Sequence, residues 1–540
     1  MRLKIFAATT ALLLASASTA QGPAENPEFS AEAFRSHVAF LADDLLEGRN
    51  AGERGYDIAA SYVATRFEGL GLKQAVPNSW YQQVPFVQAS LLHPPTLSIG
   101  KRVFTHGQEI IVRPSPAETR QAVEAPVVFA GYGLDLPKFG FNDYRGLDVR
   151  GKVVVVLGGF PKGTPSEMGA HLNAEKARMA QERGAIGVIT ILTREDVARR
   201  PWASRIEGSR EPVIAWLDPK AQPFLQAPKI RLAATVDTPA AEALFEGSRK
   251  SLVAVLDEAA REGAKPRGFA LKQRVSFERQ SQMTKIQSPN VLAVLPGSDP
   301  KLADEYVLLM AHLDHVGINP TREGDKVFNG AMDNASGVAT MLEVARAMAA
   351  SPNRPRRSIL FAAVTAEEDG LLGAQYLARN AVTDGKIVGV VNLDMPVLLY
   401  DFSDVIAFGA EHSTLGPIVQ RAAGRMNVAL SPDPLPQEGL FTRSDHYRFV
   451  QEGVPSVFLM TGFANGGEKA FKGFLATHYH KPSDDLKLPI DWQAGAKFAR
   501  INYLIAREIA DSADRPRWYS DSFFGRTVAA GQDKAQRPKP

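Results

Sequence analysis

The sequence predicts an α/β protein in which helices cover both faces of a mostly parallel sheet and a smaller domain interrupts the chain. At 540 residues, the chain is too long for one ordinary core. After residue 267, strand-like apolar runs alternate with segments of helical periodicity, which is typical of a parallel sheet with crossover helices. Before that point, between residues 115 and 267, short Val- and Ile-rich runs indicate a separate, mainly β insert.

Residues 27–113 are predicted to form the first part of the larger domain. Residues 31–46 and 55–70 carry apolar side chains at helical spacing. The loop between them, residues 46–52, is rich in Gly and Asn. Such a loop could approach a functional site or simply turn the chain.

The insert is predicted to span residues 115–267. Its strand candidates are residues 126–130, 152–157 and 185–192. Residues 166–183 between the last two read as a helix that Gly184 ends, which completes a strand, helix, strand unit. The only histidine of the insert, His171, is expected on the surface of this helix. We expect the insert to contribute to the shape of the protein and not to supply catalytic or metal-binding residues.

Residues 268–518 are predicted to complete the larger domain. The strand candidates are residues 290–295, 306–311, 358–364, 388–393 and 454–459, and the helix candidates are residues 335–350, 370–380, 414–426 and 492–512. The tail, residues 519–540, ends in Arg-Pro-Lys-Pro and is expected to be poorly ordered.

The first 20 residues have the layout of a secretory signal peptide. Arg2 and Lys4 precede an apolar run over residues 5–15, and Ser18-Thr19-Ala20 forms a small-residue cleavage site. We therefore expect an exported protein, either periplasmic or secreted. Residue 21 is Gln and the chain has no cysteine, so lipid attachment at a cysteine and disulfides are both excluded.

Composition and charge indicate which classes of binding partner the protein could have. Hydrophobic residues make up 45% of the chain and charged residues 22%, which is ordinary for a globular protein. Without the signal peptide, 60 basic residues face 59 acidic ones. Nothing in this balance indicates a nucleic acid or an anionic membrane as partner. The oligomeric state stays open.

Metal-ligand side chains follow three of the predicted strands. His312 and Asp314 follow residues 306–311, Glu367 and Glu368 follow residues 358–364, and Asp394 follows residues 388–393. Parallel strands bring their carboxyl ends to one edge of a sheet, where α/β proteins place their sites. Residues two apart on an extended strand also point the same way.

Each of these patterns alone is ordinary, but together they predict metal. A lone His-x-Asp is usually a surface pair, and an adjacent Glu pair is usually solvated. Gathered at one sheet edge, these acids and imidazoles would repel unless cations held them. Asp333, in a loop of small residues before a predicted helix, suits a bridging role, and His480 adds a second imidazole. A pair of ions needs such a bridge, terminal ligands and a free base.

The chain resembles the secreted two-zinc aminopeptidases, whose relatives include glutamate carboxypeptidases and the non-enzymatic transferrin receptor. The resemblance covers most of residues 27–113 and 268–512. It is carried by Ala311-His-Leu-Asp-His315, Asn329-Gly-Ala-Met-Asp-Asn-Ala-Ser-Gly337, Thr365-Ala-Glu-Glu368, Asn392-Leu-Asp394 and Thr477-His-Tyr-His-Lys-Pro-Ser-Asp484. The insert, with Phe129-Ala-Gly-Tyr-Gly133 and residues 142–148, resembles a protease-associated domain.

The resemblance implies a three-layer α/β/α zinc-exopeptidase domain and a role for each site residue. His312 and Asp394 would bind one zinc ion, Glu368 and His480 the other, and Asp333 would bridge them. Cobalt or manganese could also occupy such ligands.

Three further residues receive roles from the resemblance. The Asp314 carboxylate would hold His312 in the required tautomer. Glu367 would be the general base that takes a proton from the attacking water. Tyr479 is a candidate oxyanion donor, or an ordinary packed tyrosine. His315 and His446 are expected to be pocket wall or hydrogen-bond support, and His478 is not expected to be a ligand.

These expectations favour a zinc-dependent exopeptidase that acts on peptides outside the cytoplasm. An aminopeptidase is preferred because no feature of the sequence announces a carboxylate-binding pocket, whereas an acidic site can receive a free amine. The alternatives are a carboxypeptidase or dipeptidase on the same scaffold, and a binding protein that keeps the fold without catalysis.

Overall fold

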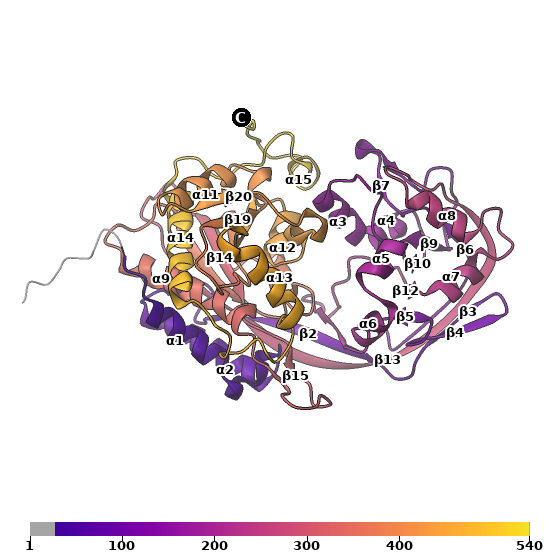
Figure 1. The fold of residues 1–540 in the computed structure, drawn as a ribbon, viewed down its shortest axis with the longest axis horizontal. Coiled ribbons are helices and arrows are strands. Elements are labelled where there is room, and N and C mark those ends of the chain that lie inside the picture. The colour runs from indigo at the N-terminus through magenta and orange to yellow at the C-terminus, as the bar shows by residue number, and fades with distance from the viewer. Residues whose placement is uncertain (1–26, 539–540) are drawn as a thin grey trace, which may run out of the picture.

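The computed structural model describes residues 27–538, which form two lobes joined by long strands (Figure 1). The predicted signal peptide, residues 1–20, lies outside the described residues. The large lobe comprises residues 27–91 and 281–538, and the insert lobe comprises most of residues 96–277. No helix within residues 27–538 has both the length and the apolar character needed to cross a membrane.

The central sheet of the large lobe is mixed, with parallel strands in the middle. Its order is β1 (Lys73–Gln74), β13 (Phe269–Leu295), β17 (Ser358–Val364), β14 (Glu305–His312), β18 (Lys386–Leu393), β21 (Ser456–Thr461), β19 (Asp404–Phe408) and β20 (Ala429–Ser431). The strands from β17 to β21 run parallel, whereas β13 and β19 pair antiparallel with them. The predicted α/β fold with a mostly parallel sheet is confirmed.

Alternation along the central strands explains why helices cover both faces. Leu309 and Phe361 pack into one apolar core, whereas their neighbours Leu308 and Leu360 pack into another. The first core is completed by α1 (Ala31–Leu41), α2 (Arg54–Gly69), α9 (Ser336–Ala350), α11 (Leu415–Gly424), α13 (Gly467–Thr477) and α14 (Trp492–Asp511). The second is completed by α10 (Leu372–Arg379) and α12 (His446–Gln451). A sheet buried on both faces has continuous apolar runs, as the sequence shows.

The insert lobe has its own apolar core around a second sheet. Its strands are β3 (Thr96–Ile99), β4 (Arg102–Thr105), β5 (Ile110–Val112), β6 (Arg120–Phe129), β9 (Val153–Leu157), β10 (Gly187–Ile191) and β12 (Leu232–Val236). Its helices are α3 (Ser166–Ala174), α4 (Lys176–Glu182), α5 (Arg194–Arg199), α6 (Trp202–Glu207), α7 (Thr238–Phe245) and α8 (Leu252–Ala259). The helix expected over residues 166–183 is therefore divided into α3 and α4.

Short pairs complete the strands: β7 (Asp135–Leu136) with β8 (Phe141–Asn142), and β15 (Gly317–Ile318) with β16 (Val327–Phe328).

The boundaries of the insert differ from the predicted residues 115 and 267. Strand β3 already belongs to the second sheet, and β13 pairs with β3 and β6 before it enters the central sheet. Strand β2 (Tyr81–Leu91) follows β13 between the lobes and also pairs with β11 (Val213–Trp216). One continuous strand serves both sheets, so no break in the sequence marks the boundary.

Two other expectations are corrected where the lobes meet. His171 is buried rather than on the surface, and its Nδ1 lies 2.6 Å from the hydroxyl of Tyr447 in the large lobe. The tail is ordered from residue 519 to residue 538 and forms α15 (Phe523–Thr527). Phe524 is fully buried and packs against Trp518. Aromatic side chains anchor this segment, although its end is rich in polar residues and proline.

Candidate active site

Three parallel strands deliver the predicted site residues to one edge of the central sheet. Strand β14 ends at His312, β17 ends two residues before Ala366, and β18 ends directly before Asp394. Ala366 adopts a left-handed conformation, with φ of 52°, so the chain turns sharply before Glu367 and Glu368. The strand ends therefore place acids and an imidazole around a common cavity.

Asp333 lies between two imidazoles at the centre of this site. Its Oδ1 is 3.3 Å from Nε2 of His312, and its Oδ2 is 3.2 Å from Nε2 of His480. The same His312 nitrogen lies 3.2 Å from Oδ1 of Asp394, and the same His480 nitrogen lies 3.1 Å from Oε2 of Glu368. The structure thus brings all five predicted ligands together, with Asp333 shared between two pairs.

The chemistry of this donor set fits cations. Nδ1 of His312 lies 3.1 Å from the backbone carbonyl of Asp314, which can only accept, so this nitrogen carries a proton. In the neutral ring, the lone pair of Nε2 then faces the carboxylates of Asp333 and Asp394, an arrangement that a cation between them would stabilise. When no cation is bound, the protonated imidazoles of His312 and His480 would instead donate to Asp333. These hydrogen bonds hold the pKa of Asp333 well below its usual value, although burial alone would raise it.

Two groups of side chains are close enough to hold one ion each. His312, Asp333 and Asp394 each place a ligand atom within 4.8 Å of the other two, and so do His315, Asp333 and Glu368. Both groups contain Asp333. The second group contains His315 in place of the predicted ligand His480, whose Nε2 lies 3.2 Å from Oδ2 of Asp333 and 3.1 Å from Oε2 of Glu368. The described residues therefore fit two ions that share one carboxylate.

His315 directly contacts a candidate metal ligand. It is fully buried, and its Nδ1 lies 2.7 Å from Oε1 of Glu368. The hydrogen-bond support expected from sequence is therefore found, and it acts on Glu368. His478 instead places Nδ1 3.0 Å from Oγ of Ser483, within its own loop.

The predicted contact of the Asp314 carboxylate with His312 is wrong. The backbone carbonyl of Asp314 accepts from His312, whereas its carboxylate accepts from the backbone N–H groups of Glu367, at 3.1 Å, and Glu368, at 3.2 Å. The turn after His312 aims the carboxylate at the neighbouring strand end. Asp314 therefore positions the acidic pair, and burial raises its pKa to about 6.

Glu367 lines the cavity beside His312 and Asp394 but belongs to neither of the two ligand groups. Burial raises the pKa of its carboxyl well above the usual value, and the charge of Asp394 adds to this effect. Glu367 therefore lies beside the candidate ligands without belonging to either group.

Two buried residues that the sequence analysis did not assign hold the loops of the site. Asp484 accepts from the backbone N–H groups of Met332, at 2.8 Å, and Asp333, at 3.0 Å. The guanidinium of Arg49 donates to the carbonyls of Leu313, Asn329 and Gly330. Two signals were available: Asp484 ends a motif of the resemblance, and Arg49 lies in the loop of residues 46–52.

A relay of side chains also positions Asp394. Ser444 donates from Oγ to Oδ2 of Asp394 at 2.6 Å, and Asn392 donates from Nδ2 to the same Oγ at 2.6 Å. Such partners of a ligand carboxylate fix its orientation.

The site opens into a cavity of about 170 Å³ with a polar and an apolar side. The apolar side is formed by Met395, Leu440, Phe458, Met460, Phe471 and Leu475. Tyr479 also lines the cavity, and its ring centroid lies 3.9 Å from that of His480. The mouth carries Glu438 and Arg443, whose charged atoms are 3.9 Å apart.

His446, next to this cavity wall, predicts a dependence of stability on pH. It is fully buried, with ring centroids 5.1 Å from Phe441 and 5.5 Å from Phe458, and burial lowers its pKa to about 3. Below pH of roughly 6.5, the unfolded chain binds a proton here that the folded protein does not bind until about pH 3. Stability is therefore lost as the pH falls through this window.

The substitution His446→Leu removes this proton and keeps the volume. Between pH 6.5 and 5, the free energy of unfolding of the wild type should fall by about 2 kcal/mol more than that of the variant. Denaturant unfolding at both pH values, with chelator present throughout, measures the difference. Parallel losses in the two proteins would contradict a buried neutral imidazole.

Comparisons with known proteins match two parts of the chain to known families. Residues 290–506 match peptidase family M28, and residues 123–211 match the PA domain. Aminopeptidase Y of Saccharomyces cerevisiae is 28% identical over 258 residues, which cover 46% of this chain and 42% of the yeast protein. A probable zinc metalloprotease of Pyrenophora teres f. teres is 43% identical over 109 residues, which cover 19% of this chain and 22% of the fungal protein. The chain thus spans less than half the length of these relatives.

A solved structure has the same fold over both lobes. The aminopeptidase from Aneurinibacillus sp. strain AM-1 superposes with a TM-score of 0.50 at 20% identity, over 95% of this chain and 98% of that one. The M28 match includes strands β14, β17 and β18, which carry the site, and the PA match lies within the insert lobe. Residues 290–506 of this chain are therefore similar to peptidase family M28, and the insert lobe contains a segment, residues 123–211, that is similar to the PA domain.

Proposed function

We propose that this chain is a zinc-dependent aminopeptidase that removes N-terminal residues from peptides. One observation carries the proposal: the Asp333 carboxylate lies between His312 and His480, and each imidazole nitrogen also faces a second carboxylate. This is the arrangement that two ions with a shared bridge require.

In this proposal, His312 and Asp394 hold one zinc ion, Glu368 and His480 hold the other, and Asp333 bridges them. A zinc pair held by these residues would lower the pKa of a bound water molecule to about 7, so that it ionises at neutral pH. The ions would also polarise the peptide carbonyl. His315 would orient Glu368, because its Nδ1 lies 2.7 Å from that carboxylate. Asp314 and Asp484 would hold the two loops that carry ligands.

Glu367 acts as the general base. Its carboxylate accepts the proton of the attacking water and returns it to the leaving amine. The raised pKa suits this role, because a base that must also give the proton back works best when its pKa is closer to the working pH. Tyr479 would donate to the developing oxyanion, a role supported by its position on the cavity wall beside His480.

The free amine of a peptide would enter an acidic site, which favours an aminopeptidase. One observation favours a second candidate: Arg443 at the cavity mouth could pair with a substrate carboxylate, as a carboxypeptidase or dipeptidase would need. The signal peptide predicted over residues 1–20 supports the further proposal that the substrates are peptides outside the cytoplasm.

Peptides blocked at one end separate these activities. An aminopeptidase should cleave carboxyl-blocked peptides and leave amino-blocked peptides intact, and a carboxypeptidase should do the reverse. Chelation should stop cleavage, and added zinc should restore it. A non-catalytic binding protein would cleave neither set, and activity that survives complete zinc removal would refute the proposal.

A further inference from the structure

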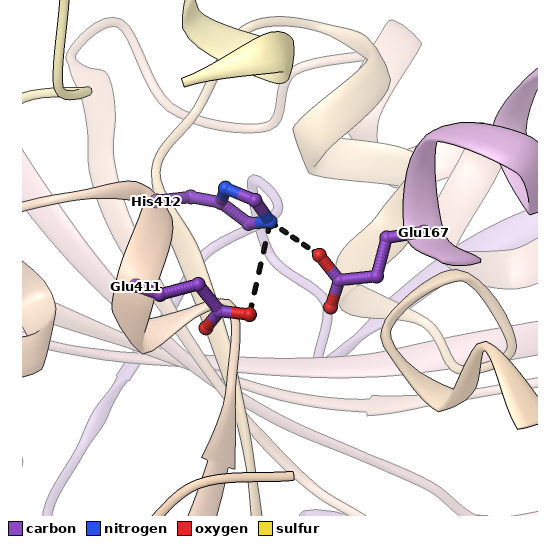
Figure 2. Close-up of side chains that lie close together, drawn as sticks. All are labelled: Glu167, Glu411 and His412. Carbon is purple, nitrogen blue, oxygen red and sulfur yellow. Dashed lines mark hydrogen bonds and ion pairs between the residues drawn. The ribbon is translucent and has the colours of Figure 1, made fainter. Parts of the chain in front are cut away.

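A third group of metal-ligand side chains lies where the two lobes meet. Glu167 belongs to α3 of the insert lobe, whereas Glu411 and His412 belong to the short helix Ala410–His412 of the large lobe. Figure 2 shows the two carboxylates approaching the same side of the imidazole from different parts of the chain. The group contains none of the active-site residues.

The three side chains converge on a small volume. Nε2 of His412 contacts Oε2 of Glu167 and lies 3.9 Å from Oε1 of Glu411. One ligand atom of each residue lies within 4.8 Å of the other two. Ligands bound to one zinc ion at about 2.0–2.2 Å are roughly 3.5 Å apart from each other. Small side-chain rotations would therefore seat an ion among the three.

Within residues 27–538, His412 is the only side chain that forms an ion pair with Glu167 or Glu411. A protonated His412 would neutralise only one of the two carboxylates. The nearby guanidinium of Arg537 is engaged by both carboxylate oxygens of Asp521, at 2.8 and 3.1 Å. A divalent cation would neutralise both Glu167 and Glu411.

The second nitrogen of His412 has a partner that orients the ring. Its Nδ1 lies 3.3 Å from the hydroxyl of Ser522, in the ordered tail. Ligand imidazoles in metal sites are commonly fixed through their other nitrogen in this way. The side chains of His412 and Glu167 are 14% and 13% exposed, whereas that of Glu411 is 52% exposed, so water could complete the coordination.

We propose that Glu167, Glu411 and His412 bind a divalent cation that fastens the insert lobe to the large lobe. One imidazole and two carboxylates suit zinc, cobalt or manganese. Helix α3, which carries Glu167, also contacts the short helices Pro436–Glu438 and Leu440–Thr442. Because Glu438 and Leu440 line the active-site cavity, the ion would also steady one wall of that cavity.

Zinc titration of the metal-free full-length protein tests this site by stoichiometry. The wild type should bind one more zinc ion per chain than Glu411→Gln, at the same free zinc concentration, as measured by mass spectrometry after dialysis. Because the Glu411 side chain is exposed, the variant Glu411→Gln should fold like the wild type. The matched control is Glu68→Gln, on the exposed face of α2. Residues that only orient ligands cost roughly 10–100-fold in affinity when mutated, so loss of Glu411 should cost at least ~10-fold.

A second measurement isolates the lobe junction from the active site. In an Asp333→Asn background, zinc should still raise the unfolding temperature, and the added change Glu411→Gln or Glu167→Gln should reduce that rise. Equal stoichiometry and equal temperature shifts with and without Glu411 would overturn the proposal and leave a simple imidazolium–carboxylate pair. Loss of all zinc binding in Asp333→Asn would overturn it too. Peptidase activity is scored separately, so failure of the proposed function would not mimic either result.

Discussion

Glu367→Gln is expected to abolish most peptide hydrolysis while the zinc content stays unchanged. The amide has the shape of the carboxylate but cannot accept the proton of the attacking water. General-base catalysis by a positioned side chain contributes about 10²–10⁴-fold, so kcat should fall by this factor. Glu367 belongs to neither of the two ligand groups, so the candidate ligands keep their positions. Steady-state kinetics on carboxyl-blocked peptides and zinc analysis of the same sample provide the two readouts.

Glu368→Gln is the matched control, because it changes the adjacent acid in the same turn. Glu368 contacts His315 and His480, so its loss should lower zinc content as well as activity. The two variants should therefore differ in metal and not only in rate. Full turnover by Glu367→Gln, or equal zinc loss in both variants, would show that the roles of the two acids are assigned wrongly.

Asp333→Asn is expected to lower both the metal affinity of the active site and the peptidase activity. Both oxygens of Asp333 face an imidazole, His312 on one side and His480 on the other. An amide keeps the size of the side chain, but it replaces one oxygen by a nitrogen and removes the charge that two cations would share. Since changes to residues that only orient ligands already cost roughly 10–100-fold in metal affinity, loss of the bridge should cost at least ~100-fold.

Zinc affinity measured by competition with a chelator is the direct test of the bridge. Asp57→Asn, on the exposed face of α2, controls for the loss of an acid elsewhere. Circular dichroism checks that the sheet is intact. An Asp333→Asn protein that keeps both active-site ions at wild-type affinity would refute the bridging role, whatever its activity.

Much of the site could be predicted because it depends on rules that act locally along the chain. Apolar runs such as residues 358–364, bounded by turn-forming residues, are typical of buried strands in a covered sheet, and parallel strands present their ends at one edge. His312 and Asp394 directly follow such runs, so their approach is a consequence of the topology. In the structure they lie 3.2 Å apart, between Nε2 and Oδ1.

Other features could not be predicted, because the partners come from distant parts of the chain. Asp314 has the residue type and spacing of an imidazole partner, yet its carboxylate accepts from the N–H groups of the turn after β17. Nothing in the loop of residues 46–52 shows that Arg49 will donate to carbonyls more than 260 residues away, such as that of Leu313. Periodicity reports which side of an element is buried, but not which atom it meets.

The sequence by itself determined the α/β class of this protein, five strands of its central sheet, and the acids and imidazoles that meet at one edge of that sheet. Strands β1, β19 and β20 of the same sheet were not predicted. The tertiary structure alone decided where the insert begins, that the tail is ordered, and that Glu167 meets His412 across the lobes. The physical reason is the range of the interactions. The burial of a strand can be predicted from residues that are neighbours in the sequence. A contact between lobes, an aromatic anchor or a strand shared by two sheets depends instead on surfaces that exist only once both partners have folded.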